Sequence, residues 1–418
     1  MNNESRCEIK KTSFLRYVAK LIFLFVILIP TSVFSQEKEV YYDEIFYDSR
    51  LSNKSTATMV GTSFHMILRP IDEAVPSPKF MLGMEKYSSV SSLGIAGRIV
   101  KFSLLELPLI SYACTFQHEL GHGFRLRDFD NKPEYSFSFP FPYNRFLRQK
   151  NPIGQTRTED VNQYLSPVSR SLKTIGGLEA NQVFSKYLLD NSLQNQEIDR
   201  PLSTIYFFAK LNAPLYGKVY RDSDAETDGD LEQASWAKNI RTKAWINALD
   251  LVVVNTIYKS ATYFIDGDYK KDLPWIEIQQ NISVLPGASY YLIPFGEAYE
   301  LNFLSRIYEY GFRLDFARWD FIQNVKASYF KLKMMELYKN RGFGVDAEIS
   351  FVDHQPDLVN EDWNNRQATA GLNLEGRYFV NSVLFLELLS SYKTSGYLPN
   401  YSIKKGSTFG AGVGLGNF

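Results

Sequence analysis

The sequence predicts an α+β fold, with a helical half followed by an antiparallel β-sheet or a barrel-like half of about eight strands. Between about residues 90 and 265 the apolar residues recur at the helical period, and after residue 285 they recur at every second position. The chain has 418 residues, of which 45% are hydrophobic, so it is long enough for two cores. We therefore expect a mainly helical domain over residues 36–280 and an antiparallel β domain over residues 285–418.

Residues 1–35 have the pattern of a secretory signal peptide. Basic residues precede the apolar run LIFLFVILIP, which Pro30 ends, and a small-residue cleavage site follows before Gln36. The run is too short to cross about 30 Å of hydrocarbon, and an uncleaved anchor is the alternative. Cys7 leaves with the signal, so Cys114 is the single cysteine of the mature chain. Export without an intramolecular disulfide indicates a bacterial envelope protein, in the periplasm or the outer membrane.

The first half contains three segments that we expect to be helical. Residues 107–125 suit a helix because Pro108 fits its first turn. The first half of this segment is apolar on every side, so it is expected to be buried in protein or lipid. Residues 176–190 begin a second helix with two glycines, and residues 231–265 are long enough for two helices or one bent helix.

The second half contains about eight candidate strands between Ser289 and Phe418, which is enough to close a small barrel. Such strands at the end of an exported chain, with an aromatic last residue, resemble outer-membrane β-barrels. Gly414 and Gly416 depart from that pattern, because the family has apolar residues at these places, so a soluble β-sandwich is the alternative. The residues expected on the apolar faces of the strands are Phe312, Leu314, Phe343, Val345, Leu372, Leu374, Phe409 and Val413.

The motif that carries chemistry is His-Glu-x-x-His, formed by His118, Glu119 and His122. Residues four apart share one face of a helix, so both imidazoles can point at one ion. A catalytic zinc site uses three protein ligands and leaves a fourth position for water, and the adjacent glutamate is placed to act as general base. Only four histidines occur in the chain, which favours a shared role for these two. Gly121 within the motif permits close approach of another backbone segment.

These residues resemble the zincin metallopeptidases of the gluzincin kind, over roughly residues 105 to 190. The resemblance implies a Zn²⁺ cofactor, with a glutamate of a second helix as the third zinc ligand. The segment GGLEAN supplies Glu179 for that role. The sequence departs from the commonest family pattern, which has an Asp a few residues on, because position 183 is Val. A glutamate that stabilises the start of a helix is the alternative interpretation of Glu179.

A second source of the third ligand is the acidic segment DSDAETDGDLE, residues 222 to 232, through Asp228 or Asp230. That arrangement would resemble the site-2-type intramembrane proteases, which have His-Glu-x-x-His on an apolar helix and a later Asp ligand. The Asn-Pro motif of that family is absent, and Lys101 and Glu106 interrupt the apolar helix. The same acidic segment matches a calcium loop only in part, because Ser235 stands where a bidentate glutamate is needed.

We therefore expect an exported zinc-dependent peptidase of a bacterial envelope, acting on a peptide or protein substrate. The alternatives are a site-2-type intramembrane metalloprotease, or an outer-membrane β-barrel or structural protein with a non-catalytic metal site. The alternating strands indicate association with a membrane through the C-terminal β half. Nucleic acid is not an expected partner, because 46 basic residues are balanced by 46 acidic residues.

Overall fold

The structure is a computed structural model that describes most of the chain after residue 42. The predicted signal peptide, Asp228, Asp230 and Phe418 lie outside the described residues. The described residues are 43–48, 50–74, 92–138, 154–158, 166–195, 197–219, 234, 236–267, 269–308, 310–340, 342–358, 360, 362–380 and 384–415.

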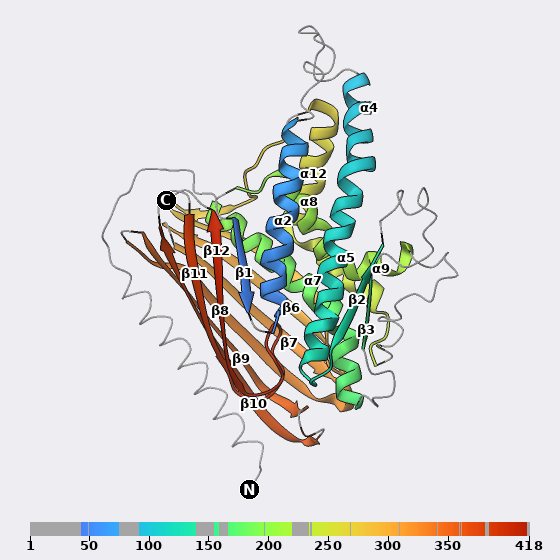
Figure 1. Ribbon diagram of the computed structural model, residues 1–418, viewed down its shortest axis with the longest axis vertical. Coiled ribbons are helices and arrows are strands. Elements are labelled where there is room, and N and C mark those ends of the chain that lie inside the picture. Colours follow the sequence, from blue (N-terminus) through green and yellow to red (C-terminus); the bar gives the residue numbers. More distant parts are fainter. Residues whose placement is uncertain are drawn as a thin grey trace. The chain divides into compact units, whose positions relative to one another are not determined.

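The α+β prediction is confirmed, and the main element is a ten-stranded antiparallel sheet. The strand order is β1-β12-β11-β10-β9-β8-β7-β6-β5-β4, so all but the first strand run in chain order (Figure 1). The strands are β1 Asp43–Asp48, β4 Ile276–Gln279, β5 Ile282–Ile293, β6 Gly296–Ile307, β7 Tyr310–Phe321, β8 Lys326–Asn340, β9 Phe343–Asp357, β10 Asp362–Phe379, β11 Leu384–Lys393 and β12 Gly406–Leu415. A separate hairpin pairs β2, Pro133–Phe137, with β3, Gly154–Thr158.

The sheet does not close on itself, so of the two arrangements expected for the second half, the antiparallel sheet is confirmed and the eight-stranded barrel is wrong. Strands β1 and β4 are its two edges, and no described residue of one pairs with the other. Strand β1 comes from the N-terminal part of the chain and pairs with β12 from Asp43↔Leu415 to Asp48↔Gly410. The helical part, expected over 36–280, and the β part, expected over 285–418, therefore share a sheet, and both belong to one compact unit that begins at Val40.

Apart from η3, the described helices lie between β1 and β4 in the chain, and the longest described helical run joins three elements. Helix α4 continues through the π-helical turn η1 into α5, which carries the His-Glu-x-x-His motif. The helices are α2 Asn53–Ala74, α4 Ser92–Lys101, η1 Phe102–Glu106, α5 Leu107–Arg127, α7 Pro167–Asn195, α8 Arg200–Lys210, α9 Asn212–Val219, α11 Ile240–Ala244, η2 Trp245–Leu249, α12 Leu251–Asp266 and the short η3 Ile322–Asn324.

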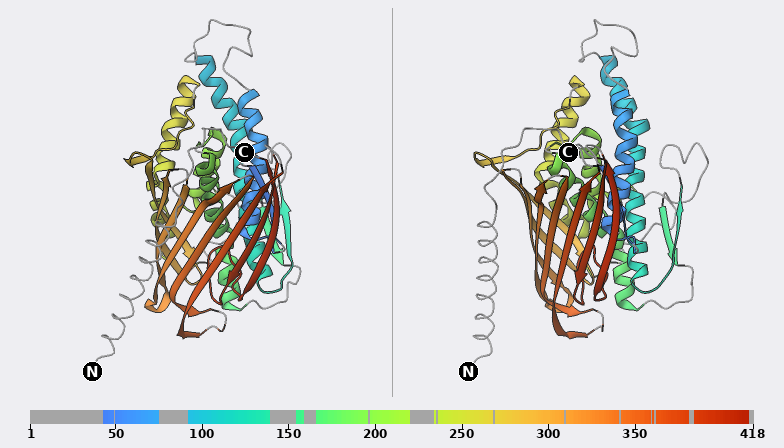
Figure 2. Two further views of the ribbon diagram at one scale, coloured as in Figure 1. Left: turned by 90° about the vertical axis from the view of Figure 1, so that its left-hand side faces the viewer. Right: turned by 60° about the vertical axis from the view of Figure 1, so that its left-hand side comes forward.

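The helices lie against one face of the sheet, with α7 next to the strands and α5 packed on α7 (Figure 2). Ion pairs fix α7 to the sheet: Lys186 binds Glu300 and Asp315, each at 2.7 Å. Asp190, one turn further along α7, binds Arg313 of β7 at 2.9 Å. The sheet therefore presents charged residues to the helices, and its other face is turned away from them.

Candidate metal centre

Helices α5 and α7 cross at glycines, which lets their backbones touch. A side chain on Gly121 would overlap the carbonyl of Gly176, and a side chain on Gly176 would lie 2.8 Å from the carbonyl oxygen of Gly121. The expectation that Gly121 permits close approach of a backbone segment is confirmed. The next glycine, Gly177, leaves room for an imidazole, because a Cβ there would lie 2.5 Å from Nε2 of His118.

The two histidines of the motif converge on each other through their Nε2 atoms. The distance between Nε2 of His118 and Nε2 of His122 is 3.1 Å, and the rings are nearly perpendicular, at 84°. Nδ1 of His122 donates a hydrogen bond to the carbonyl oxygen of Lys173 at 2.7 Å. A neutral imidazole that donates through Nδ1 carries its lone pair on Nε2, the atom that faces His118.

Glu119 is held by the hairpin strand β3, which covers the motif. The hydroxyl of Thr156 donates to Oε2 of Glu119 at 2.7 Å and approaches the carbonyl oxygen of the same residue at 2.9 Å. Gly154 packs over the other side of this carboxylate, since a Cβ there would lie 2.7 Å from Cγ of Glu119. His118, Glu119 and His122 are each only 2% exposed, so the motif is closed to solvent in this state.

The other strand of the hairpin is attached to the end of α5. Tyr135 of β2 packs against Gly123, and its hydroxyl accepts a hydrogen bond from Arg127 at 2.8 Å. Burial raises the pKa of the Tyr135 phenol, so it stays neutral at this contact. Phe137 stacks on Phe116 of α5 with ring centroids 4.4 Å apart. The hairpin is therefore packed on the side of α5 that presents Glu119.

Glu179 is buried on α7, as expected for a functional carboxylate, but its partner in the structure is Arg125. The guanidinium of Arg125 donates to both oxygens of Glu179, at 2.6 Å to Oε1 and 2.7 Å to Oε2. Asn53, Tyr397 and the backbone N–H of Asn400 also donate to this carboxylate. The structure thus brings Glu179 into a buried ion pair and does not bring it together with the two histidines.

Arg125 and Thr156 are site residues that the sequence reasoning missed. Arg125 follows His122 by three residues, so the helical period places it on the buried stripe of the motif. A buried guanidinium needs a carboxylate partner, so the position of Arg125 on this stripe indicated a buried ion pair. The structure shows that the partner is Glu179. Thr156 had no such signal, because its contact with Glu119 spans 37 residues of sequence.

The described residues contain no group of three or more His, Cys, Asp or Glu side chains arranged to hold a metal ion. His118 and His122 are brought together, and Cys114, one turn before them, is buried as core filler. Asp228 and Asp230, the alternative third ligands, lie outside the described residues.

The charges that interrupt the apolar helix before the motif are paired inside the protein. Lys101 and Arg200 both contact Asp72, at 2.8 Å and 2.6 Å, and both contact Glu106, at 3.1 Å and 2.5 Å. Within the described residues, the helical run Gly94–Arg127 is the one long and apolar enough to cross a membrane by length and composition. In the most apolar stretch of this run, 33% of the residues are buried inside the protein, so the run is in part a core helix.

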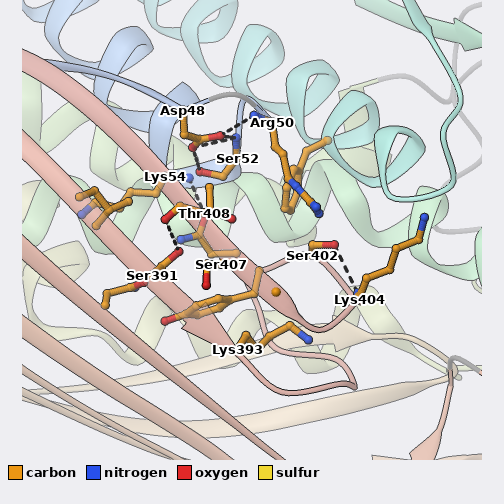
Figure 3. A pocket seen from close by; sticks show the side chains of 16 residues that line it. Asp48, Arg50, Ser52, Lys54, Ser391, Lys393, Ser402, Lys404, Ser407 and Thr408 are labelled. Carbon is orange, nitrogen blue, oxygen red and sulfur yellow. Dashed lines mark hydrogen bonds between the residues drawn. The ribbon is translucent and has the colours of Figure 1, made fainter.

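A separate polar pocket lies between the start of α2, strands β11 and β12, and the segment before β12 (Figure 3). Its cations already have partners: Lys54 is paired with Glu375, and Lys393 donates to three backbone carbonyl oxygens at 2.6–3.1 Å. Asp48 accepts hydrogen bonds from the backbone of Arg50 and from Ser52. None of the His-Glu-x-x-His side chains lines this pocket, so it is distinct from the candidate metal centre.

Comparisons with known proteins give no match: no protein-family model, no curated protein and no solved structure is similar to this chain.

Proposed function

We propose that this protein is an exported zinc-dependent peptidase of a bacterial envelope, in the periplasm or the outer membrane. His118 and His122 are the proposed zinc ligands, and Glu119 is the proposed general base. The observation that carries the proposal is the 3.1 Å convergence of the two Nε2 atoms on a buried helix face, beside a buried carboxylate. The substrate class is a peptide or protein.

The histidine pair fits a tetrahedral ion. Two nitrogen ligands at 2.0–2.1 Å from a tetrahedral zinc lie about 3.3 Å apart, close to the 3.1 Å between Nε2 of His118 and Nε2 of His122. The hydrogen bond from Nδ1 of His122 to the carbonyl of Lys173 is the kind of support that metal-bound imidazoles have. Zinc bound at this pair would supply a water molecule with a pKa near neutrality.

Glu119 would accept the proton of that water and return it to the leaving amine. Thr156 donates a hydrogen bond to Oε2 of Glu119 and so fixes the orientation of the carboxylate. The other oxygen, Oε1, would accept the proton. Strand β3 contacts Glu119 through Thr156 and Gly154, so the hairpin would hold the general base in position.

The identity of the third ligand separates two versions of the proposal. In the gluzincin-like version, Glu179 exchanges Arg125 for the metal. In the site-2-type version, Asp228 or Asp230 is the ligand, and the apolar helical run Gly94–Arg127, which is long enough to span a membrane, favours this version. Zinc content after Glu179→Gln, Asp228→Asn and Asp230→Asn distinguishes them, because only removal of the true ligand lowers the zinc stoichiometry of a folded chain.

The test of the function combines metal analysis with a protease assay on the purified mature chain. We expect about one zinc per chain, lost in His118→Ala and His122→Ala. Glu119→Gln should keep the zinc and lower peptide hydrolysis by several orders of magnitude, because the ligands stay while the base is removed. His354→Ala, a change at an exposed histidine of β9, is the matched control and should keep both zinc and activity. A wild-type chain without zinc, or an active Glu119→Gln chain, contradicts the proposal.

A further inference from the structure

We propose that the face of the large sheet turned away from the helices contacts the acyl chains of a lipid bilayer. This outer face is apolar, and its side chains are exposed or half-exposed. The proposal is independent of the metal centre and of any peptidase activity. The residues that define it are Ile45, Tyr47, Leu301, Phe303, Phe312, Leu314, Phe316, Phe330, Leu332, Phe343, Val345, Ile349, Phe351, Leu372, Leu374, Tyr378, Leu386, Leu388, Tyr392, Phe409, Ala411 and Val413.

The strand register joins these side chains into continuous rows across the sheet. Neighbours in register on one face of a sheet lie about 4.5–5.5 Å apart, so each row is an unbroken apolar strip. Leu388 and Phe409 are each 68% exposed, although residues of this type are normally buried. One row runs Phe303, Leu314, Leu332, Ile349, Leu372, Tyr392, and another runs Phe343, Tyr378, Leu386, Val413, Ile45.

The face turned toward the helices carries buried charges beside an apolar core that includes Trp319 and Tyr329. Arg313, Lys333, Glu348 and Asn373 form one row in register across β7 to β10, and all four are buried. Asp190 of α7 neutralises part of this row, because it binds Lys333 at 3.0 Å as well as Arg313. An antiparallel sheet of a water-soluble protein places its apolar face inward and its polar face in water. Here the outward face is apolar and the inward face holds a row of buried charges, an arrangement also found in strands that face lipid.

Strand β1, an edge of the open sheet, is sealed by side chains of α2. Ser55 and Thr62 donate to the carbonyl oxygens of Phe46 and Glu44, at 2.9 Å and 2.7 Å. Thr58 accepts from the N–H of Phe46 at 3.1 Å. Sheet edges are tolerated in hydrocarbon only when their backbone groups are satisfied inside the protein. The three hydroxyls replace the missing neighbouring strand, which removes this obstacle to lipid contact at β1.

At the other side of the sheet, a backbone group of β5 is also satisfied by a helical side chain. Beyond the short β4, the N–H of Tyr290 on β5 donates to Oδ1 of Asn247 at 2.6 Å. Asn247 belongs to η2, which packs on β5 and is itself anchored by its donation to the carbonyl of Lys210. Helical residues thus supply hydrogen-bond partners at both sides of the open sheet.

The height of the apolar face matches a bilayer. On β10 and the residue that follows it, the outward positions carry no charge from Ala368 to Val380, a length of about 40 Å at 3.3–3.4 Å per residue. Strands tilted by about 40° would project this length onto about 30 Å, which is the thickness of the hydrocarbon core. Charged outward residues such as Arg318 and Lys326 begin where the apolar rows end. Charged side chains at the ends of an apolar band about 30 Å high are placed to meet lipid headgroups. A second copy of the sheet would not require a band of this height.

The experiment measures whether these positions meet lipid in the full chain. In membranes of an expressing Gram-negative bacterium, single cysteines are placed at Leu372 and Leu388 in a Cys7→Ser, Cys114→Ala background. Lys326→Cys, outside the apolar rows, is the matched control. Reaction with a membrane-impermeant maleimide in broken membranes should be at least about tenfold slower at Leu372→Cys and Leu388→Cys than at Lys326→Cys. Denaturation in dodecyl sulfate should make all three equally reactive.

A second measurement needs no substitution and so cannot fail through misfolding of a variant. After an alkaline carbonate wash, the wild-type chain should stay in the membrane pellet. Recovery in the supernatant overturns the proposal, as does equal reactivity of the three cysteines in membranes. A soluble dimer with protected cysteines at positions 372 and 388 also overturns it, because the occupant is then a second copy. Loss of zinc binding or peptidase activity would leave both measurements unchanged.

Discussion

Substitution of Gly177 by alanine should weaken metal binding although no metal ligand is replaced. The added Cβ at position 177 would lie 2.5 Å from Nε2 of His118, whereas an unstrained contact needs about 3.5 Å, so the imidazole must move by about 1 Å. Metal–ligand distances tolerate only about 0.2 Å, so a shift of this size removes His118 from a shared ion. We expect zinc affinity to fall by at least about 10–100-fold, the range seen when the support of a ligand is lost.

The Gly177→Ala chain should lose no more than about 3 kcal/mol of unfolding free energy and stay folded. Overpacking of a core costs about 1–3 kcal/mol, and the gain from replacing glycine by alanine in a helix offsets up to about 1 kcal/mol of that cost. The matched control is Gly97→Ala on α4, where a Cβ meets nothing within 4 Å. That variant should keep its zinc and gain slightly in stability.

The assay is competition for zinc against a chelator of known affinity, with the thermal midpoint measured in parallel. A Gly177→Ala chain that binds zinc like the wild type would refute the geometric reasoning, because His118 would then not depend on the space at this glycine. If the Gly97→Ala control also loses zinc, the loss reports general destabilisation and the assigned role of Gly177 fails.

Three further substitutions test the contacts around the site and the sheet edge. Arg125→Met leaves the carboxylate of Glu179 buried without its cation and should cost about 3–5 kcal/mol of unfolding free energy, measured by denaturant titration; a loss below about 1 kcal/mol would contradict the buried pair. Thr58→Val removes a hydroxyl partner from the edge of β1 and should cost about 1–3 kcal/mol, so an unchanged stability would argue against edge sealing. Thr156→Val should lower kcat more than it raises KM, because Glu119 loses the donor that orients it; an unchanged kcat with normal zinc content would exclude that role.

Much of the fold followed from local patterns in the sequence. The predicted helix over 107–125 corresponds to α5, and the period-two alternation after residue 285 corresponds to the long antiparallel strands. Leu372 and Leu374 were expected on an apolar face, and both are exposed on the outer face of the sheet. These predictions succeeded because side-chain periodicity is a property of neighbouring residues and needs no knowledge of tertiary contacts.

By itself, the sequence determined the helical spacing of His118 and His122, the glycine that lets α5 approach another helix, and the alternation of the strands. Only the tertiary structure decided that Arg125 takes the carboxylate of Glu179, and that the sheet stays open with β1 sealed by hydroxyls of α2. The physical reason is the range of the interactions. Helical and strand periods act over a few residues, whereas the partner of a buried charge or an edge backbone group is whichever group the packed chain brings within hydrogen-bonding distance.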